Sequence, residues 1–299
     1  MSIKKQRNDV SVVIVSYNTE KLLYNCIKSI YEQTSGLSFE VIVVDNNSSD
    51  NSTEVIAENF PDVKVIKLPE NVGFGNASNL GADYANSKYV LFLNSDTILK
   101  NNAIKLFYDY FETHNKSNDI GAIGGLLIDE NDEIIHSFGR FPKLSRDLVR
   151  MLKDRFYKTT RIFKRYVKTS NKTIESGLVD YITGADLFVP VEVFKRLGGF
   201  DKYFFMYFEE SDLQLRMQKE GLKRMVVEGP SIIHLEGASF NKPKTNLKRI
   251  YYDRSMLHFY SKNLGFFSYC FLFFVKLMNI FSLRYTFKEN IEYIKALRR

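Results

Sequence analysis

The chain has 299 residues, of which 44% are hydrophobic and 26% charged, so it can bury a large core. Its two cysteines, Cys26 and Cys270, belong to no CxxC pair or Cys/His cluster, which excludes a disulfide framework and a zinc signature. We therefore expect a reducing, cytoplasmic location. The first nine residues are polar and basic and contain no signal-peptide hydrophobic region, in agreement with that expectation.

The net charge of +7 is unevenly distributed along the chain. Residues 140–172 contain twelve Lys and Arg against two Asp, and residues 242–299 contain twelve against three acids. These two segments carry +10 and +9, so the remainder of the chain is acidic. The basic positions fall in no nucleic-acid-binding motif, and we expect no nucleic-acid partner.

Hydrophobic strand patterns alternate with helical patterns over the first hundred residues. In chain order, the sequence predicts a strand at 10–17, a helix over 22–30, a strand at 39–44, a helix after Asn51, a strand at 63–68, a helix at 77–84 and a strand at 89–93. This alternation is typical of an α/β protein with a mainly parallel sheet flanked by helices. Ligands of such sheets bind beyond the carboxyl ends of the strands.

Polar residues follow three of these strands, at the expected ligand edge. They are Ser16-Tyr17-Asn18 after the first strand, Asp45-Asn46-Asn47 after the second and Asn94-Ser95-Asp96 after the fourth.

Residues 73–78 begin like a dinucleotide-binding GxGxxG motif. Ser78 replaces its third glycine, however, and the motif does not open the first strand–helix unit. Two interpretations stay open: a loop whose backbone approaches a ligand, and a glycine turn before a helix.

Both basic segments have helical hydrophobic patterns. Residues 144, 148, 152 and 156 form an apolar stripe, which 162–167 continue, and 264–275 form an apolar run too short for a bilayer span of about 20 residues. The flanking Lys and Arg predict amphipathic helices that lie on an anionic membrane surface. The alternatives are core helices with solvated basic faces, and oligomer contacts.

Residues 204–213, FFMYFEESDL, place three carboxylates directly behind an aromatic run. Apolar surroundings and neighbouring like charges raise a carboxyl pKa, which favours a general base near neutral pH. Alternatively, Ser211 and Gln214 form a capping box for a helix that Gly221 ends, with Asp212 stabilised by the helix dipole. The capping box leaves Glu209 and Glu210 ahead of the helix.

Six motifs in this order resemble family 2 glycosyltransferases, in their rhamnosyltransferase-like branch. They are VVIVSYN at 12–18, VVDNNSSD at 43–50, NVGFG at 71–75, LNSD at 93–96, TGA at 183–185 and the segment around Glu209. The resemblance covers about residues 10–240. It implies a GT-A fold with a Rossmann-like nucleotide-binding half, a nucleotide-diphosphate sugar donor, a divalent metal ion and inversion at the anomeric carbon.

For the donor side, the resemblance implies that Asp45 binds the base or ribose. The segment 94–96 matches the family's metal-binding DxD position, with Asn94 in place of the first acid. Asp96 and His234 are then the expected ligands of Mg²⁺ or Mn²⁺. The remaining residues expected at the nucleotide-sugar site are Ser16, Tyr17, Asn18, Asn71, Gly73, Gly75, Asn94 and Ser95.

For the acceptor side, the resemblance implies that Glu210 is the catalytic base, with Glu209 as the alternative. Thr183, Gly184 and Ala185 are expected to line the acceptor, where a glycine lets the backbone approach a sugar. Asp212 is assigned either to the acceptor side or to the helix start. Asp186 departs from the branch, which more often has an apolar residue there.

We therefore expect residues 1–240 to form a GT-A domain containing the 140–172 insertion, and 241–299 to form a basic, aromatic helical segment that can also mediate oligomerisation. The expected reaction transfers a sugar, with rhamnose the branch's commonest, to a saccharide or lipid-linked saccharide of a surface polysaccharide at the inner face of the membrane. Two alternatives stay open: a non-catalytic nucleotide-sugar-binding or membrane-binding protein of the same fold, and a nucleotidyltransferase.

Overall fold

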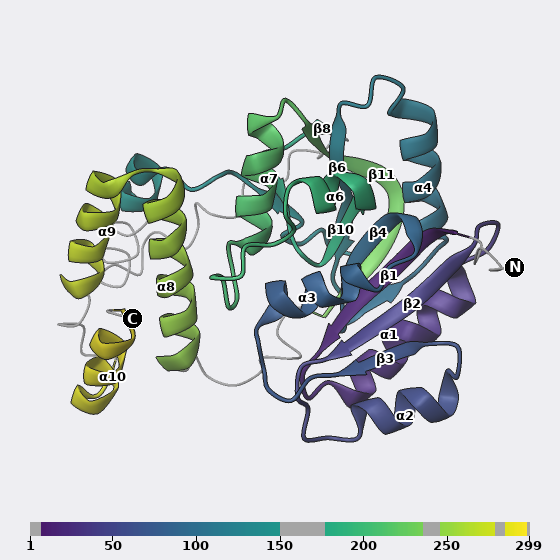
Figure 1. Ribbon diagram of the computed structural model, residues 1–299, viewed down its shortest axis with the longest axis horizontal. Helices are drawn as coiled ribbons and strands as arrows, with labels where there is room; N and C mark the ends of the chain where they lie inside the picture. The colour runs from purple at the N-terminus through teal and green to yellow at the C-terminus, as the bar shows by residue number, and fades with distance from the viewer. Residues whose placement is uncertain (1–6, 150–176, 236–245, 279–284, 298–299) are drawn as a thin grey trace, which may run out of the picture.

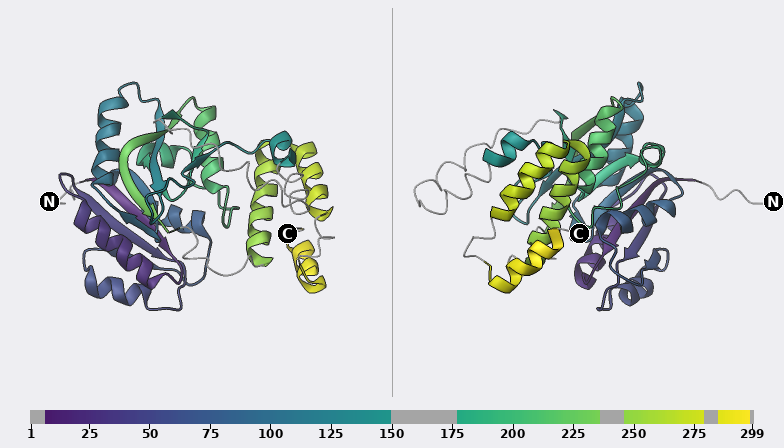
Figure 2. Two further views of the ribbon diagram at one scale, coloured as in Figure 1. Left: turned by 180° about the vertical axis from the view of Figure 1, so that it is seen from behind. Right: turned by 60° about the vertical axis from the view of Figure 1, so that its left-hand side comes forward.

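The computed structural model describes residues 7–149, 177–235, 246–278 and 285–297 (Figure 1). Within these ranges a nine-stranded sheet lies between two layers of helices. Three C-terminal helices lie to one side of the sheet in each view (Figures 1 and 2).

The first half of the chain forms parallel strands joined by helices. Its elements are β1 (Asn8–Ser16), α1 (Glu20–Gln33), β2 (Phe39–Asp45), α2 (Ser52–Asn59), β3 (Lys64–Lys67), α3 (Phe74–Asp83) and β4 (Ser87–Asn94). The strands lie in the order β3-β2-β1-β4 and are all parallel. β1 and β2 are buried runs rich in Val and Ile, which suits strands covered on both faces. The predicted parallel α/β arrangement is confirmed here.

The second half continues the sheet with strands of both directions. Its elements are β5 (Thr97–Leu99), α4 (Ala103–His114), β6 (Ile120–Ile128), β7 (Phe138–Gly139), β8 (Gly177–Leu178), β9 (Tyr181–Ile182), β10 (Asp186–Pro190), α6 (Val191–Arg196), α7 (Glu209–Lys219) and β11 (Lys223–His234). The order is β4-β10-β6-β11-β5, and β10 and β5 run antiparallel to their neighbours. The sheet is therefore mixed, although most of its long strands are parallel.

Two hydrophobic cores cover the faces of the sheet. Helices α1, α2 and α4 pack on one face, and α3, α6 and α7 pack on the other. The register pairs Ser16 with Asp45, and Val15 with Asn94, so the carboxyl ends of β1, β2 and β4 lie side by side. The fold thus brings the predicted strand-end motifs to one edge.

The C-terminal helices form a third core. They are α8 (Asn246–Asn263), α9 (Phe266–Met278) and α10 (Phe287–Leu297). Phe204 and Phe208, from the loop before α7, are buried against Met256 and Phe259 of α8. The C-terminal helices are therefore packed against the segment that leads into the acidic helix.

Some sequence predictions fall on residues outside the described ranges. Of the 140–172 segment, only 140–149 are described, with a helical turn beginning at 144, so most of its predicted stripe lies outside. The domain boundary expected at 240 also lies outside. No helix in the described ranges combines the length and hydrophobicity needed to cross a bilayer.

A buried ion pair joins the C-terminal helices. Lys276 Nζ of α9 lies 2.5 Å from Asp253 Oδ1 of α8, and Tyr293 of α10 donates its hydroxyl to Asp253 Oδ2 at 2.7 Å. Lys276 is 6% exposed and Asp253 is also 6% exposed. One carboxylate therefore connects three helices.

Replacing Lys276 with Ala is expected to destabilise the protein by about 3 kcal/mol or more, because it leaves the Asp253 carboxylate buried without its cation. The free energy of unfolding can be measured by urea titration. Lys288→Ala, at an exposed position of α10, is the control and should change the stability by less than about 0.5 kcal/mol. Equal, small effects of both substitutions would contradict the role given to this pair.

Candidate functional site

The end of β2 presents Asp45 at the predicted ligand edge. Asp45 is 4% exposed, and its Oδ2 accepts a hydrogen bond from the Ser48 backbone N–H at 3.0 Å. Asn46 N–H donates to Ser16 O at 2.8 Å, which fixes the end of β2 against the end of β1. The turn thus holds Asp45 in place by its backbone and by one carboxylate oxygen.

Hydroxyl groups link the ends of β1 and β4. Ser16 Oγ lies 2.9 Å from Thr19 Oγ1, which donates to Ser95 Oγ at 3.1 Å. Thr19, which the sequence analysis does not single out, therefore joins two predicted site residues. Its place three residues after Ser16 is the only sequence signal for this role.

Tyr17 and Asn18 extend β1 into an outer loop. Tyr17 is 50% exposed, and Asn18 has a φ of +55°. The Asn18 side chain accepts a hydrogen bond from Ser49 N–H at 2.7 Å, so it ties this loop to the one after β2. The Tyr17 side chain is thus accessible to a ligand, whereas the Asn18 side chain holds the two loops together.

Gly73 forms the turn that begins α3, with a φ of +87°. A Cβ on Gly73 would lie 2.1 Å from Phe205 O, and the Phe74 N–H donates to that oxygen at 2.9 Å. Asn71 Oδ1 accepts from Gly73 N–H at 3.0 Å. Of the two open interpretations, a glycine turn before a helix is observed, and the backbone it approaches is that of Phe205.

Asn46 connects this turn to β2. Its Oδ1 accepts from Val72 N–H at 2.9 Å, and its Nδ2 donates to Gly73 O at 3.3 Å. A Cβ on Gly75, the second residue of α3, would lie 3.4 Å from Glu209 Cβ. The small residues of this motif therefore let α3 approach the acidic helix α7.

Asp96 and His234 lie side by side although they are far apart in sequence. β5 pairs antiparallel with β11 so that His234 is opposite Thr97, next to Asp96. His234 Nε2 is 3.2 Å from Asp96 Oδ1 and 3.3 Å from Asn94 Nδ2. The structure thus brings together the two residues expected to hold a metal ion.

The Asp96–His234 pair fits two ligands of one divalent cation. Neighbouring ligands of an octahedral Mg²⁺ site are about 3 Å apart, close to the observed separation. A carboxylate and an imidazole suit Mn²⁺ as well, and phosphate oxygens and water usually complete such sites. Among the described residues no cluster of three or more His, Cys, Asp or Glu converges, so a bound ligand would have to supply the other contacts.

Helix α7 begins at Glu209, two residues before the predicted cap. Its N-cap is Phe208, with a φ of +70°, and Tyr207 has a φ of +72°. The predicted capping box of Ser211 and Gln214 is therefore wrong. The physical reason is that the Gln214 amide instead binds the Ile182 backbone, with Ile182 N–H donating to Oε1 and Nε2 donating to Ile182 O, both at 2.8 Å.

The left-handed conformation of Tyr207 and Phe208 is unusual for bulky residues and costs backbone energy. The loop is held from both sides, because Phe74 N–H binds Phe205 O, and Ser255 Oγ of α8 donates to Met206 O at 2.7 Å. As a result Glu209 and Glu210 lie in the first turn of α7 rather than ahead of it.

The two glutamates occupy different surroundings. Glu209 is 4% exposed and packs against Gly75. Glu210 is partly exposed and lies one turn before Gln214, whose amide binds Ile182. Burial raises the pKa of Glu209 well above its usual value, and the charge of Glu210 adds to the effect. Burial also raises the pKa of Glu210 to about 7, against the lowering by hydrogen bonds at the helix start. Glu210 is thus the more accessible proton acceptor near neutral pH.

Residues 183–185 lie between the end of β4 and the start of α3. Ala185 O accepts from Asn94 N–H at 3.1 Å, and a Cβ on Gly184 would lie 3.3 Å from Phe74 Cε1. Thr183 N–H donates to Ser137 O at 3.0 Å. The expected acceptor segment therefore adjoins the expected donor segment.

Asp186 is a fully buried acid at the start of β10. Its Oδ2 accepts from Gly125 N–H at 2.6 Å. Burial raises the pKa of Asp186 to about 7, although the Gly125 N–H and the charge of His234 act in the opposite direction. An acid here departs from the family pattern, and the structure confines it within the sheet.

Asp212 lies in an ion network between α7 and α8. It is fully buried; its carboxylate accepts from Arg216 and Lys262 at 2.9 Å and from Asn263 Nδ2 at 3.0 Å. These contacts turn Asp212 towards α8. The structure therefore does not support its assignment to the acceptor side, and its role is to fix the acidic helix against the C-terminal helices.

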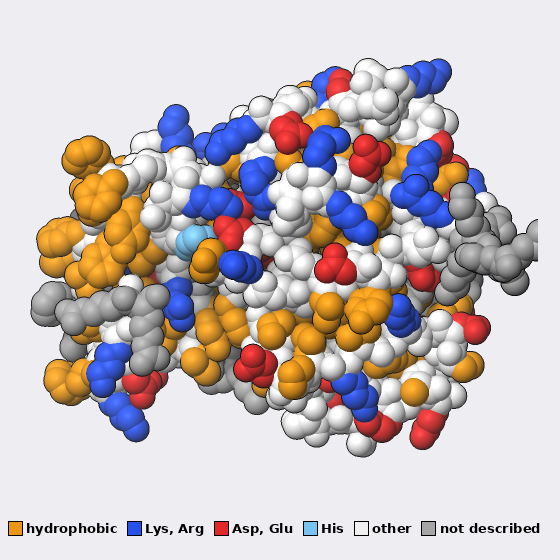
Figure 3. Space-filling model, viewed as in Figure 1, with side chains coloured by type: hydrophobic (Ala, Val, Ile, Leu, Met, Phe, Trp, Pro, Cys, Tyr) orange, Lys and Arg blue, Asp and Glu red, His pale blue; other side chains and the backbone are white. Residues whose placement is uncertain are grey.

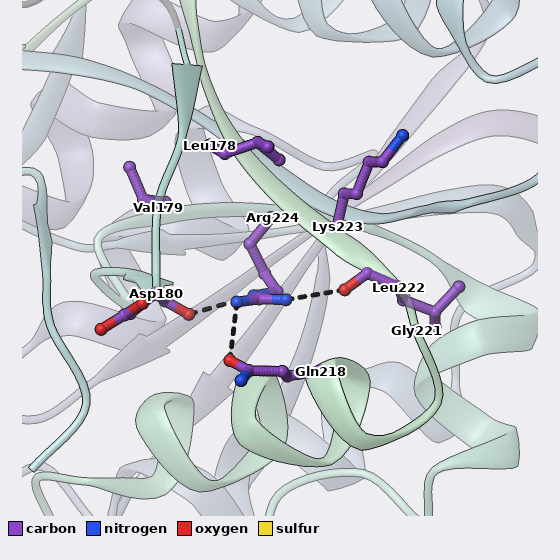
Figure 4. A pocket seen from close by; sticks show the side chains of 8 residues that line it. All are labelled: Leu178, Val179, Asp180, Gln218, Gly221, Leu222, Lys223 and Arg224. Carbon is purple, nitrogen blue, oxygen red and sulfur yellow. Dashed lines mark hydrogen bonds between the residues drawn. The ribbon is translucent and has the colours of Figure 1, made fainter.

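A separate hollow lies at the other end of α7 (Figure 4). Arg224 points into it but donates to Asp180 O at 3.0 Å, Leu222 O at 2.7 Å and Gln218 Oε1 at 3.1 Å. These contacts hold the guanidinium within the protein. None of the residues that line the hollow belongs to the predicted site.

Unsatisfied polar atoms mark the edge of the sheet as a ligand site. Within the described part of the chain, nine buried side-chain atoms have no hydrogen-bond partner, and five of them belong to Asp186 and to four predicted site residues: Asp45 Oδ1, Thr183 Oγ1, Asp186 Oδ1, Glu209 Oε2 and His234 Nδ1. Buried polar atoms are rarely left in this state, and several together indicate a place where a ligand or water completes the bonding.

Comparison with known proteins agrees with the geometry. The family described as "Glycosyl transferase family 2" matches residues 11–173. A glycosyltransferase of Nostoc sp. without assigned function is 34% identical over 48% of this chain and 45% of its own length. The N-acetylglucosaminyl-diphospho-decaprenol L-rhamnosyltransferase of Mycobacterium tuberculosis is 25% identical over 75% of both chains. The match spans less than half the length of the first curated relatives.

Among solved structures, the mannosyltransferase PcManGT of Pyrobaculum calidifontis, in complex with GDP-Man and Mn²⁺, is similar with a TM-score of 0.55. The likeness covers 98% of this chain and 76% of that one, at 16% identity. It confirms the expected GT-A fold.

Asp186→Asn is expected to raise the stability at pH 8 by roughly 2–4 kcal/mol. The carboxyl pKa is higher in the folded chain than in the unfolded chain, so stability is greatest below about pH 4 and is lost as the pH rises towards 7. Asn cannot ionise, so the variant does not lose stability at this position as the pH rises. Urea titrations at about pH 4 and pH 8 test the prediction, with Asp83→Asn, at an exposed position, as the control. An unchanged or lower stability at pH 8 would refute it.

Proposed function

Because the chain belongs to glycosyl transferase family 2, we propose that it transfers a sugar from a nucleotide-diphosphate sugar to a saccharide acceptor, with inversion at the anomeric carbon. One observation carries the proposal: Asp45 and the Asp96–His234 pair lie at the same edge of the sheet, and Glu209, beside Glu210 in the first turn of α7, packs against Gly75 at the start of α3. These groups supply a nucleotide contact, a metal site and a proton acceptor.

Donor binding would use the first half of the sheet. The free Oδ1 of Asp45 can accept a hydrogen bond from the base or ribose, and the exposed Tyr17 lies beside it on the loop after β1. Asp96 and His234 would hold Mg²⁺ or Mn²⁺, which when bound neutralises charge on the departing diphosphate. Asn94 Nδ2 lies 3.3 Å from Nε2 of His234, which would no longer accept a hydrogen bond from Asn94 once it binds the ion.

Transfer would then need a base on the opposite side of the sugar. The Glu210 carboxylate accepts the proton of the acceptor hydroxyl while that oxygen bonds to the anomeric carbon. The bond between the anomeric carbon and the diphosphate oxygen breaks, and the nucleoside diphosphate leaves with its electron pair. The pKa of the Glu210 carboxyl, about 7, leaves this residue available as a base near neutral pH.

For the substrates, we propose rhamnose as the donor sugar and a lipid-linked saccharide of a surface polysaccharide as the acceptor. The mycobacterial relative, which is named for rhamnosyl transfer to a diphospho-decaprenol-linked sugar, supports both choices. The basic C-terminal segment supports a peripheral location at the inner, cytoplasmic face of the membrane, where anionic lipid is available.

A screen of nucleotide-diphosphate sugars separates this proposal from its alternatives. A glycosyltransferase releases a nucleoside diphosphate, whereas a nucleotidyltransferase releases diphosphate from a nucleoside triphosphate. A non-catalytic binding protein releases neither. Burial and, after it, the charge of the adjacent Glu210 raise the pKa of Glu209, and this costly pair of acids favours a catalyst over a scaffold.

Glu210→Gln is expected to lower kcat for transfer at least about a hundredfold, because the amide cannot accept the proton. Donor binding, measured by calorimetry, should change little. In the unchanged enzyme, kcat should rise with pH towards about 7 and then level off, since only the ionised carboxylate accepts a proton. Glu209→Gln is the matched control; if it abolishes transfer while Glu210→Gln does not, the base is Glu209.

Removing the divalent ion with a chelator is expected to abolish transfer, and adding Mg²⁺ or Mn²⁺ should restore it. Asp96→Asn and His234→Ala should each weaken the binding of Mn²⁺ to the donor-bound protein by about tenfold or more, as measured by electron paramagnetic resonance. The control is Asp83→Asn, which changes an exposed residue of α3 that belongs to no predicted site. Full turnover in excess chelator would rule out this metal assignment.

A further inference from the structure

Helix α9 exposes a face of large apolar side chains. Its exposed residues lie along one side of the helix and are Phe266, Phe267, Cys270, Phe271, Phe274 and Met278. The four phenylalanines are 46–88% exposed. A surface helix of a globular protein normally turns its polar side to solvent, so this face indicates an interaction surface. In Figure 3 the hydrophobic side chains gather over α9, at the left of the molecule.

The charge of α9 lies on its inner side. Lys276 is buried in the ion pair with Asp253, and Leu272, one turn earlier, is buried beside it. Rotating the helix to cover its phenylalanines would pull Lys276 away from Asp253 and leave both charges without a partner. The aromatic face is therefore fixed outwards by the core of the C-terminal helices.

Helix α10 adds apolar groups and carries two lysines together with the acids Glu289 and Glu292. Phe287 is 83% and Ile291 37% exposed, and Lys288 and Lys295 are exposed on the same helix. Basic side chains lie at the lower left of Figure 3, beside the apolar surface. The charge of +9 over residues 242–299 complements an anionic surface.

The charge of the C-terminal segment favours lipid over a second copy of the chain. Residues 242–299 carry +9, so two copies that met through this face would bring like charges together, whereas an anionic lipid surface is complementary to them. A lipid surface needs no matching shape and accepts aromatic side chains at headgroup depth.

We propose that the exposed face of α9, together with Phe287 and Ile291 of α10, docks on an anionic lipid surface. Helix α8 connects this face to the catalytic segment, because Ser255 binds Met206 O and the Tyr251 ring stacks on Phe205 at 4.5 Å between centroids. Docking therefore holds the start of α7 at a fixed height above the lipid. The inference that this position gives access to a lipid-linked acceptor rests on the proposed function, whereas the docking itself does not.

Flotation of the full chain with vesicles tests the docking. The unchanged protein is expected to float with vesicles of phosphatidylglycerol and phosphatidylcholine, and more weakly with phosphatidylcholine alone or at high salt. Phe267→Ser with Phe274→Ser should weaken partitioning by about tenfold or more for each ring removed. Both positions are exposed, so the variant should keep the fold and thermal stability of the unchanged protein.

Leu178→Ser is the matched control, because Leu178 is 68% exposed on β8, outside the C-terminal helices. It should leave vesicle binding unchanged. Lys288→Glu with Lys295→Glu should weaken binding to anionic vesicles only. The rate at which nucleoside diphosphate is released during sugar transfer to a water-soluble acceptor should be the same for every one of these variants, which separates a failure of docking from a failure of the proposed function.

Two results would overturn the inference. One is an unchanged protein that binds no vesicles of either composition. The other is a dimer in light scattering that the double phenylalanine variant converts to a monomer without any change in vesicle binding, because the face would then belong to a second copy of the chain.

Discussion

The contact between Gly73 and Phe205 is the constraint on which the site depends. Only glycine leaves room for the Phe205 carbonyl oxygen, because a Cβ at position 73 would lie 2.1 Å from it. The Phe74 N–H donates a hydrogen bond to the same oxygen. The contact joins the turn that begins α3 to the loop that begins α7. Through it, the turn at the start of α3 is held against the loop that leads to the paired glutamates, and α8 supports the same loop from the other side through Ser255.

The site contains buried polar groups and strained backbone that lower the stability of the fold, and the rest of the protein offsets this loss. Glu209, Glu210 and Asp186 are carboxyls whose pKa values burial raises, and two bulky residues, Tyr207 and Phe208, adopt left-handed conformations beside them. The hydrophobic cores on both sheet faces and among the C-terminal helices supply the stability that tolerates this arrangement. Local strain and unsatisfied polar atoms thus coincide where chemistry is proposed.

Sequence reasoning succeeds where the signal is local. The strands from β1 to β4 follow from short apolar runs separated by helical patterns, and their direction follows from the crossovers. The Asp96–His234 pair needed the family resemblance, because strand pairing between β5 and β11 joins distant segments and leaves no spacing signal. The capping box failed because tertiary contacts to Phe205 and Met206 set where α7 begins. Likewise, periodicity in α9 identifies its apolar content but not which side the protein covers.

The pairing of β11 with β5 also divides the site along the chain. Asp45 and Asp96 lie within the first hundred residues, whereas His234 arrives on the last strand of the sheet. Contacts between such distant segments close large loops and are characteristic of slow steps in folding. A newly synthesised chain therefore contains Asp45 and Asp96 long before His234 can reach them, so the proposed site is incomplete until the sheet is finished.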